Sequence, residues 1–307
     1  MWFAFQDRQY HQDDDRPDLK STRLEQIAIG MQGAVYRLPG ERIAKIWFHA
    51  GDGELRRLGE LYAAIDGQLP FRTPRMIEIR RPGPYHVTIE AELPGVPLDK
   101  VAPAFGEAGW ERARDCVVDV LAALAEVDAP EVLRRMTVLD EVDPFRPEGT
   151  SWIEALTGLV RRRVVRFGDQ LAAVIDDFDG KVERLLHQLS GMKEPERRLV
   201  HGDVTAGNIL VDEDLWPVAL IDLGMLTMAG DPVFDAAAAA SLVELWSPRV
   251  REVEAAFDQA FVEQLGYDAE QLLVYRRIHS LLIANAHDAD PYGRDSAVPL
   301  AAALFNR

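Results

Sequence analysis

Two carboxylates and one carboxamide in the second half of the chain have the types and spacing that phosphoryl transfer requires. Asp203 and Asn208 belong to the segment His-Gly-Asp-Val-Thr-Ala-Gly-Asn, and Asp222 follows in Ile-Asp-Leu-Gly. Such a reaction needs a carboxylate that orients a substrate hydroxyl and accepts its proton. It also needs oxygen ligands for magnesium ions that hold nucleotide phosphates. Asp203 is the candidate for the first task, and Asn208 and Asp222 are the candidate metal ligands.

The segment between Asn208 and Asp222 predicts how these ligands meet. It reads as an apolar strand Ile-Leu-Val, a polar turn, and a second apolar strand Val-Ala-Leu-Ile. This order is typical of a β-hairpin. Because a hairpin returns to its start, we expect Asp222 to lie beside Asn208. A surface hairpin without chemistry has the same pattern, but the preceding His201-Gly202 and the following Gly224 favour the functional interpretation.

Candidate nucleotide-binding residues lie upstream, in segments with strand-like alternation. Gly30 and Gly33 belong to a turn between two such segments, where glycine would let backbone amides approach phosphate closely. An ordinary hairpin could carry the same glycines. Lys45 shares one face of a strand with Ile43 and Trp47, because alternate strand residues point the same way. A lysine on an apolar face favours contact with the nucleotide phosphates, unless the strand is at a sheet edge.

A helix is predicted to follow, over about residues 53–65. Glu54 falls on one face with Leu58 and Leu61 at helical spacing, so we expect its carboxylate to point inward and to pair with Lys45. The alternative is a first-turn glutamate that only complements the helix dipole.

Taken together, these motifs resemble the aminoglycoside phosphotransferase and choline kinase superfamily, whose signature is His-Gly-Asp-x-x-x-x-Asn followed by Ile-Asp-x-Gly. The resemblance extends from about residue 24 to about residue 240. It implies an α+β, protein-kinase-like fold of two lobes. The small N-lobe would hold an antiparallel sheet and one helix, and the larger C-lobe would be mostly helical. The implied cofactors are Mg²⁺ and ATP or GTP as phosphoryl donor.

The resemblance also implies boundaries and further roles. The expected parts are an irregular lead-in at 1–20, the N-lobe at 21–95 and the C-lobe at 96–307, with helices of the acceptor-binding region at about 140–195. Backbone groups near Glu92 would meet the nucleotide base at the hinge between the lobes. Asp235, in the segment Gly-Asp-Pro-x-x-Asp, would anchor the backbone around Asp203.

The bulk composition limits the partners. The net charge of -17 over 307 residues argues against nucleic acid and anionic membranes, whose phosphates would be repelled. It is compatible with a cationic small substrate, although acidity for solubility alone explains it as well. No apolar run is long enough to span a bilayer, and the first residues become charged too early for a signal peptide. A single cysteine, Cys116, suits the cytoplasm. The oligomeric state does not follow from the sequence.

Two absences favour a small-molecule kinase over a protein kinase. Gly202 occupies the position where protein kinases carry an arginine, and no Ala-Pro-Glu follows Asp222 to build a platform for a peptide. A catalytically silent nucleotide-binding scaffold is the alternative of another class. It is disfavoured because the four residues that a decayed enzyme would lose are all present: Asp203, Asn208, Asp222 and Lys45.

The chemical class of the acceptor is predicted only from the acidic side chains of the sequence. Several carboxylates lie in segments expected near the acceptor: Asp143, Glu154, Asp288, Asp290 and Asp295. With the acidic net charge they favour a hydroxylated amine such as an aminoglycoside or amino sugar. The alternative is a metabolic or biosynthetic kinase for a sugar, an amino alcohol or a natural-product intermediate.

Overall fold

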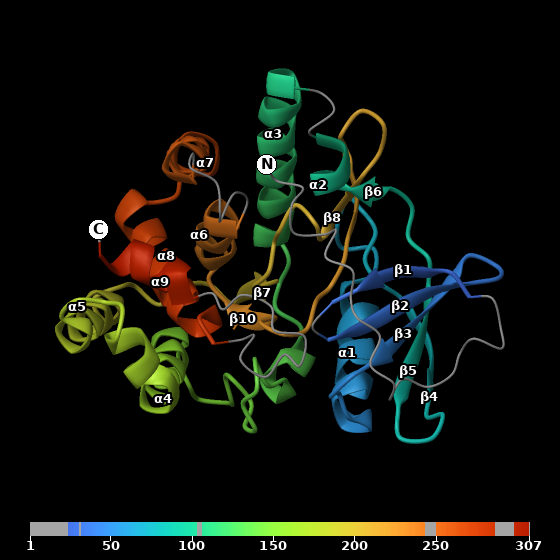
Figure 1. Ribbon diagram of the computed structural model, residues 1–307, viewed down its shortest axis with the longest axis horizontal. Helices are drawn as coiled ribbons and strands as arrows, with labels where there is room; N and C mark the ends of the chain where they lie inside the picture. Colours follow the sequence, from blue (N-terminus) through green and yellow to red (C-terminus); the bar gives the residue numbers. More distant parts are fainter. Residues whose placement is uncertain (1–23, 31, 103–105, 243–249, 286–297, 307) are drawn as a thin grey trace.

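The computed structural model describes residues 24–30, 32–102, 106–242, 250–285 and 298–306. A strand-rich N-lobe lies beside a larger, mostly helical C-lobe (Figure 1), so the predicted fold class is confirmed. The expected lead-in at residues 1–20 lies outside the described residues. Within the described ranges, no helix combines the length and the apolar character needed to cross a bilayer.

The N-lobe is built on a five-stranded antiparallel sheet with the order β1-β2-β3-β5-β4. Its strands are β1 (Gln26–Ile29), β2 (Gly33–Leu38), β3 (Arg42–Trp47), β4 (Met76–Arg80) and β5 (His86–Ala91). Lys45 pairs with Val35 on β2 and with Thr88 on β5. It therefore lies on the central strand rather than at an edge, which removes the main alternative for this lysine.

Helix α1 (Asp52–Ile65) packs against the sheet through a row of apolar and aromatic side chains. The buried residues recur at helical spacing and are Leu55, Leu58, Leu61, Tyr62 and Ile65. Their burial fixes which face of the helix meets β4, and all the acidic side chains of α1 lie off that face.

The short strand β6 (Val96–Pro97) leads from the N-lobe sheet to the mostly helical C-lobe, and the boundary at residues 95 and 96 stays a prediction. The helices of the C-lobe are α2 (Leu98–Val101), α3 (Gly106–Ala125), the 3-10 helix η4 (Glu131–Arg135), α4 (Trp152–Ala172), α5 (Phe178–Ser190), α6 (Val233–Leu242), α7 (Val250–Leu265), α8 (Ala269–Ile283) and α9 (Val298–Phe305). Its further strands are β7 (Arg198–Val200), β8 (Ile209–Val211), β9 (Pro217–Leu220) and β10 (Met228–Gly230). They form two small sheets, β6-β8-β9 and β10-β7. The predicted hairpin is β8–β9, in which Ile209 pairs with Leu220.

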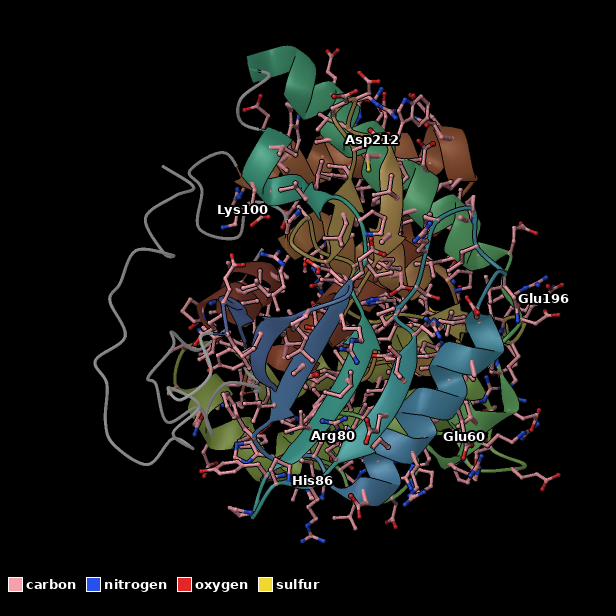
Figure 2. All side chains as sticks on the ribbon, turned by 90° about the vertical axis from the view of Figure 1, so that its right-hand side faces the viewer. Glu60, Arg80, His86, Lys100, Glu196 and Asp212 are labelled. Carbon is pink, nitrogen blue, oxygen red and sulfur yellow. The ribbon has the colours of Figure 1, made fainter. Side chains whose placement is uncertain are left out.

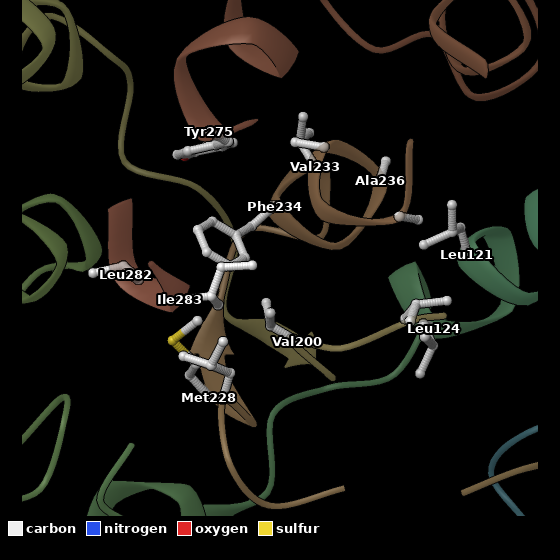
Figure 3. Close-up of a cluster of buried hydrophobic side chains, with 14 of the residues drawn as sticks. Leu121, Leu124, Val200, Met228, Val233, Phe234, Ala236, Tyr275, Leu282 and Ile283 are labelled. Atoms are coloured by element: carbon white, nitrogen blue, oxygen red, sulfur yellow. The ribbon is translucent and has the colours of Figure 1, made fainter. Parts of the chain in front are cut away.

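A dense apolar cluster lies beneath the segment that joins β7 to β8. Figure 3 shows Val200 and Met228 of the small sheet packed near Phe234 of α6 and side chains of α8. The ring of Phe234 meets the rings of Trp152 and Tyr275 edge-on, at centroid distances of 5.8 and 5.7 Å. This packing gives the loop that carries Asp203 a rigid base.

Trp152 connects the start of α4 to this base. Its indole nitrogen donates to the Tyr275 hydroxyl at 2.9 Å, and that hydroxyl donates to Asp231 at 2.8 Å. A Cβ added at Gly230 would lie 2.1 Å from the Trp152 ring, so only glycine fits there. The backbone amide of Trp152 donates to Glu194 at 2.7 Å. The first turn of α4 is therefore locked to β10 and α8.

Candidate active site

The loop between β7 and β8 is anchored by a buried carboxylate. The backbone amides of His201 and Gly202 donate to the two oxygens of Asp235 at 2.8 and 2.6 Å. Asp235 lies in the first turn of α6. Burial raises its pKa to about 7, although the two amide donors stabilise the charged form. These contacts confirm the anchoring role expected for Asp235.

Gly202 is required by the shape of this loop. Its φ of 82° lies in the left-handed region, and an added Cβ would lie 2.3 Å from the carbonyl oxygen of Leu226. The arginine of protein kinases could not occupy this position without displacing the backbone around Leu226.

The ring of His201 ties the loop to the end of β9. Its Nε2 lies 3.0 Å from the carbonyl oxygen of Ile221, and its Nδ1 accepts the Asp203 amide at 3.2 Å. Burial lowers the pKa of His201, and the Ile221 carbonyl and the charge of Asp222 act in the opposite direction. A neutral ring with its proton on Nε2 satisfies both contacts. His201 is therefore a structural link rather than an acid or base.

Asp203 and Asn208 meet as the motif predicts. The side-chain nitrogen of Asn208 donates to the carbonyl oxygen of Asp203 at 2.9 Å and to its carboxylate at 3.1 Å. Burial raises the pKa of Asp203 to about 7, with a further rise from the charge of Asp222 and a partial offset from Asn208. A carboxyl group poised near neutral pH suits a general base.

Asp222 is brought to the same place by the hairpin. The amide of Ile221 donates to the carbonyl of Asn208 at 2.9 Å, and the φ of 67° at Asp222 turns the chain at that point. Burial alone would raise the pKa of Asp222, but the ammonium of Lys45 lowers it. The Nζ of Lys45 lies 2.8 Å from Oδ1 of Asp222. The strand lysine and the two predicted metal ligands therefore converge.

The donor set fits magnesium. Asp222 offers a carboxylate and Asn208 a carboxamide oxygen, and both are hard oxygen ligands. No group of three or more histidine, cysteine or acidic side chains in the described part of the chain has metal-binding geometry. Such a sparse set suits a magnesium ion that takes its remaining ligands from nucleotide phosphates and water.

The glycine turn meets Lys45 through a residue that the sequence analysis missed. The Oε1 of Gln32 lies 3.3 Å from the Lys45 ammonium, beside the turn between β1 and β2. Gly33 is required sterically, because an added Cβ would lie 2.1 Å from the carbonyl oxygen of Ile46. Gly30 has no neighbour within 4 Å of such a Cβ, and its amide donates to Gly33 at 2.8 Å. A contact of either glycine with phosphate stays a prediction.

The predicted pair between Glu54 and Lys45 is wrong. Glu54 is exposed in the first turn of α1, and Lys45 is bonded instead to Asp222 and Gln32. The buried stripe of α1 includes Leu55, which rotates the inward face by one residue and leaves Glu54 outside.

Glu92 lies at the expected hinge, just after β5. Its amide donates to the carbonyl of Glu41 at 2.9 Å, and its carboxylate accepts from Arg37 at 2.8 Å. Both groups are therefore engaged within the N-lobe. A contact between the nucleotide base and neighbouring backbone groups stays a prediction.

The described residues give no support to the carboxylates that suggested a cationic acceptor. Glu154 caps the start of α4 in a reciprocal pair with Ser151, which is a structural role. Asp143 is exposed, and the other three, at 288, 290 and 295, lie outside the described residues.

An arginine on α4 is more buried than its sequence context indicates. Arg163 is 2% exposed, donates to Asp140, and lies over the ring of Phe167. The adjoining Leu139 donates its amide to the carbonyl of Met225 at 2.7 Å, which links this region to the loop after Asp222. A surface cavity of about 650 Å³ between α5 and α8 includes none of the predicted site residues.

Comparisons with known proteins give the family and the fold. The sequence matches the phosphotransferase enzyme family over residues 23–275, and a comparison with curated proteins found no match. A thermostable mutant of the aminoglycoside phosphotransferase APH(4)-Ia, in complex with ADP and hygromycin B, is similar with a TM-score of 0.67 and 18% identity, over 92% of both chains.

Two further solved structures are similar at lower identity. A candidate fructosamine-3-kinase from Haemophilus somnus has a TM-score of 0.60 and 15% identity, over 93% of this chain and 90% of that one. A mutant of aminoglycoside 2'-phosphotransferase-IIIa bound to GDP has a TM-score of 0.59 and 13% identity, over 92% and 89%. At these identities the likeness is one of fold.

Proposed function

Since the chain belongs to the phosphotransferase enzyme family, we propose that it transfers the γ-phosphoryl group of ATP or GTP to a hydroxyl of a small molecule. The observation that carries this proposal is the convergence of Asp203, Asn208, Asp222 and Lys45 from separate parts of the chain. Two structurally similar phosphotransferases bind ADP and GDP, which leaves both donors open.

The proposed mechanism is a direct in-line transfer. Asp203 orients the acceptor hydroxyl and takes its proton as the phosphoryl group arrives. Lys45 positions the phosphates, and Asn208 and Asp222 hold magnesium. The metal, when bound, neutralises charge that develops on the phosphate oxygens. The pKa of Asp203, raised to about 7, keeps the group basic enough to accept a proton near neutral pH.

The electrostatic cost of burying two carboxylates side by side disfavours a nucleotide-binding scaffold without catalysis. A pseudoenzyme has no need for a carboxyl group whose pKa burial raises, beside a second acidic side chain. The protein-kinase alternative is disfavoured by Gly202, whose position has no room for a side chain.

For the acceptor we favour a hydroxylated amine, such as an aminoglycoside or an amino sugar, which would make resistance to an antibiotic one biological role. The support is the net charge of -17, which attracts cations. The alternative, a metabolic kinase for a sugar or amino alcohol, draws support from the likeness to the candidate fructosamine-3-kinase. Function on this fold depends on the acceptor pocket rather than on the fold itself.

The test is a panel of acceptors. Aminoglycosides, amino sugars, neutral sugars and amino alcohols are incubated with magnesium and ATP or GTP, and products are detected by mass. The Asp203→Ala variant should lose turnover by orders of magnitude while it still binds nucleotide, because the base acts at the transfer step. Near-normal turnover in that variant would remove Asp203 from the mechanism.

The salt dependence of the Michaelis constant tests whether the acceptor is cationic. The Michaelis constant of a cationic acceptor should rise with ionic strength, because salt screens the attraction. If the best acceptor is neutral or anionic, or if its Michaelis constant does not change with ionic strength, the proposal of a cationic acceptor is wrong. The acidic net charge would then serve only solubility.

A further inference from the structure

Helix α1 offers no carboxylate to Lys45. The Oδ1 of Asp52 lies 3.0 Å from Nε2 of His86, Glu54 is exposed, and Glu60 accepts from Arg135. Figure 2 shows Glu60 on the outer side of α1 and His86 at the end of the sheet. The helix therefore turns its acidic side chains away from the lysine.

The carboxylate that Lys45 does contact, Asp222, has a second proposed task. Asp222 lies 2.8 Å from the ammonium, but it is also the strongest candidate ligand for magnesium. A magnesium ion held by Asp222 would share this carboxylate with Lys45, and the lysine would then face the nucleotide phosphates. A second fixed anion is then needed to hold the lysine in the site.

Strand β5 carries such an anion at Glu90. This residue is 5% exposed and lies two positions from Thr88, the strand partner of Lys45. The Thr88 hydroxyl donates to Oε1 of Glu90 at 2.6 Å and accepts the indole N–H of Trp47 at 3.0 Å. The Lys45 ammonium lies over the Trp47 ring, 4.1 Å from its centre. Lys45, Trp47, Thr88 and Glu90 therefore form one connected row on strands β3 and β5.

The pKa of Glu90 is raised overall, and the neighbouring groups offset only part of the effect of burial. Burial raises the pKa of Glu90, the Thr88 hydrogen bond and the charge of Lys45 lower it, and the charge of Asp222 raises it. The buried phenol of Tyr62, on α1, faces the same negative charges. Among the described residues around Glu90, Lys45 is the cation whose charge lowers the pKa of this carboxyl group.

We propose that Glu90 is the positioning residue for Lys45: a carboxylate supplied by the sheet, rather than by α1, holds the lysine once Asp222 engages magnesium. This inference rests on the proposed function, because it assigns a role within the nucleotide site. Glu90 acts through Lys45 and does not touch the reacting atoms.

The test is a double-mutant cycle read by nucleotide binding. Glu90→Gln keeps the shape of the side chain and can still accept from Thr88, but it loses the charge. Binding of magnesium–ADP and magnesium–GDP is measured by calorimetry. We expect about tenfold weaker binding in Glu90→Gln, because Lys45 loses its fixed anion. In a Lys45→Ala background, the same change should cause no weakening.

Two controls separate this role from a structural one. Glu60→Gln, which removes a carboxylate of α1 that pairs outward, should bind nucleotide like the wild type. Thermal unfolding should show Glu90→Gln at least as stable as the wild type, because a buried charge has been removed. If Glu90→Gln does not fold, Thr88→Val tests the same row, since it frees Oε1 of Glu90; we expect weaker binding that again requires Lys45.

Unchanged binding in Glu90→Gln would overturn the proposal, and so would an equal loss in the presence and absence of Lys45. A wild-type protein that binds neither nucleotide would overturn the proposed function itself, and the assignment of Glu90 with it.

Discussion

Replacing Asp203 by asparagine should abolish turnover and stabilise the protein, with a gain that depends on pH. Burial raises the pKa of Asp203 from 3.8 to about 7. A carboxyl group with a folded-state pKa above its unfolded value stabilises the fold fully below the unfolded pKa. That contribution is lost as pH rises toward the folded pKa. The ionised Asp203 of the working enzyme therefore opposes folding.

The magnitude follows from the size of the shift. About three pKa units correspond to roughly 4 kcal/mol at 1.36 kcal/mol per unit, if the group were sealed from water. Because Asp203 is only partly buried, solvent screening should reduce this, and we expect a gain of about 1–2 kcal/mol for Asp203→Asn at pH 8. Near pH 4 the gain should vanish, because the native carboxyl group is then protonated.

Urea unfolding of both proteins between pH 4 and 8 measures this difference. Asp235, whose pKa is also raised, is present in both proteins; burial is the main cause of that rise, and the smaller part that comes from the charge of Asp203 adds to the measured gain. Asp143→Asn, at an exposed site, serves as the matched control and should leave stability unchanged. A gain that is the same at pH 4 and pH 8, or a less stable Asp203→Asn at pH 8, would refute the reasoning.

Three further outcomes are expected. Turnover should rise with pH and level off above the pKa of Asp203, about 7. Saturating magnesium should lower the midpoint of this pH–rate profile, because it adds positive charge beside Asp203. A flat pH–rate profile would contradict this. Asp222→Ala should weaken magnesium-dependent nucleotide binding by roughly tenfold or more and Asn208→Ala by less, in calorimetric titrations with and without metal; equal affinities in all three proteins would exclude the metal assignment. Gly202→Ala should cost at least about 2 kcal/mol in urea unfolding, because of its positive φ and the nearby carbonyl, whereas Gly53→Ala in α1 should cost nothing.

The site was predictable where its residues are close in sequence. Asp203 and Asn208 lie in one loop, and the alternation that predicts a hairpin also predicts where Asp222 returns. Gln32 and Glu90 were not predictable in this way. Their contacts depend on how the turn folds over β3 and on which strand pairs beside it, and neither follows from a local pattern.

The error at Glu54 has a simple physical origin. Glu54 and Leu55 both fit an inward stripe with Leu58 and Leu61, because neighbouring helix positions differ by only about 100°. Burial decides between them, since Leu55 gains from leaving water and Glu54 does not. The apolar stripe therefore predicts the helix with confidence but not which of its edge residues point inward.

The locked first turn of α4 has a consequence for how this protein could change its substrate. Trp152 ties that turn to Gly230, Tyr275 and Glu194, next to the carboxylate that anchors the loop of Asp203. The later turns of α4 have a connection of their own, because Arg163 donates to Asp140 and the adjoining Leu139 donates to the carbonyl of Met225, after Asp222. Two parts of α4 are therefore tied to segments that carry candidate catalytic residues. If the proposed acceptor region includes α4, a change of acceptor and the position of the catalytic residues are coupled along a single helix.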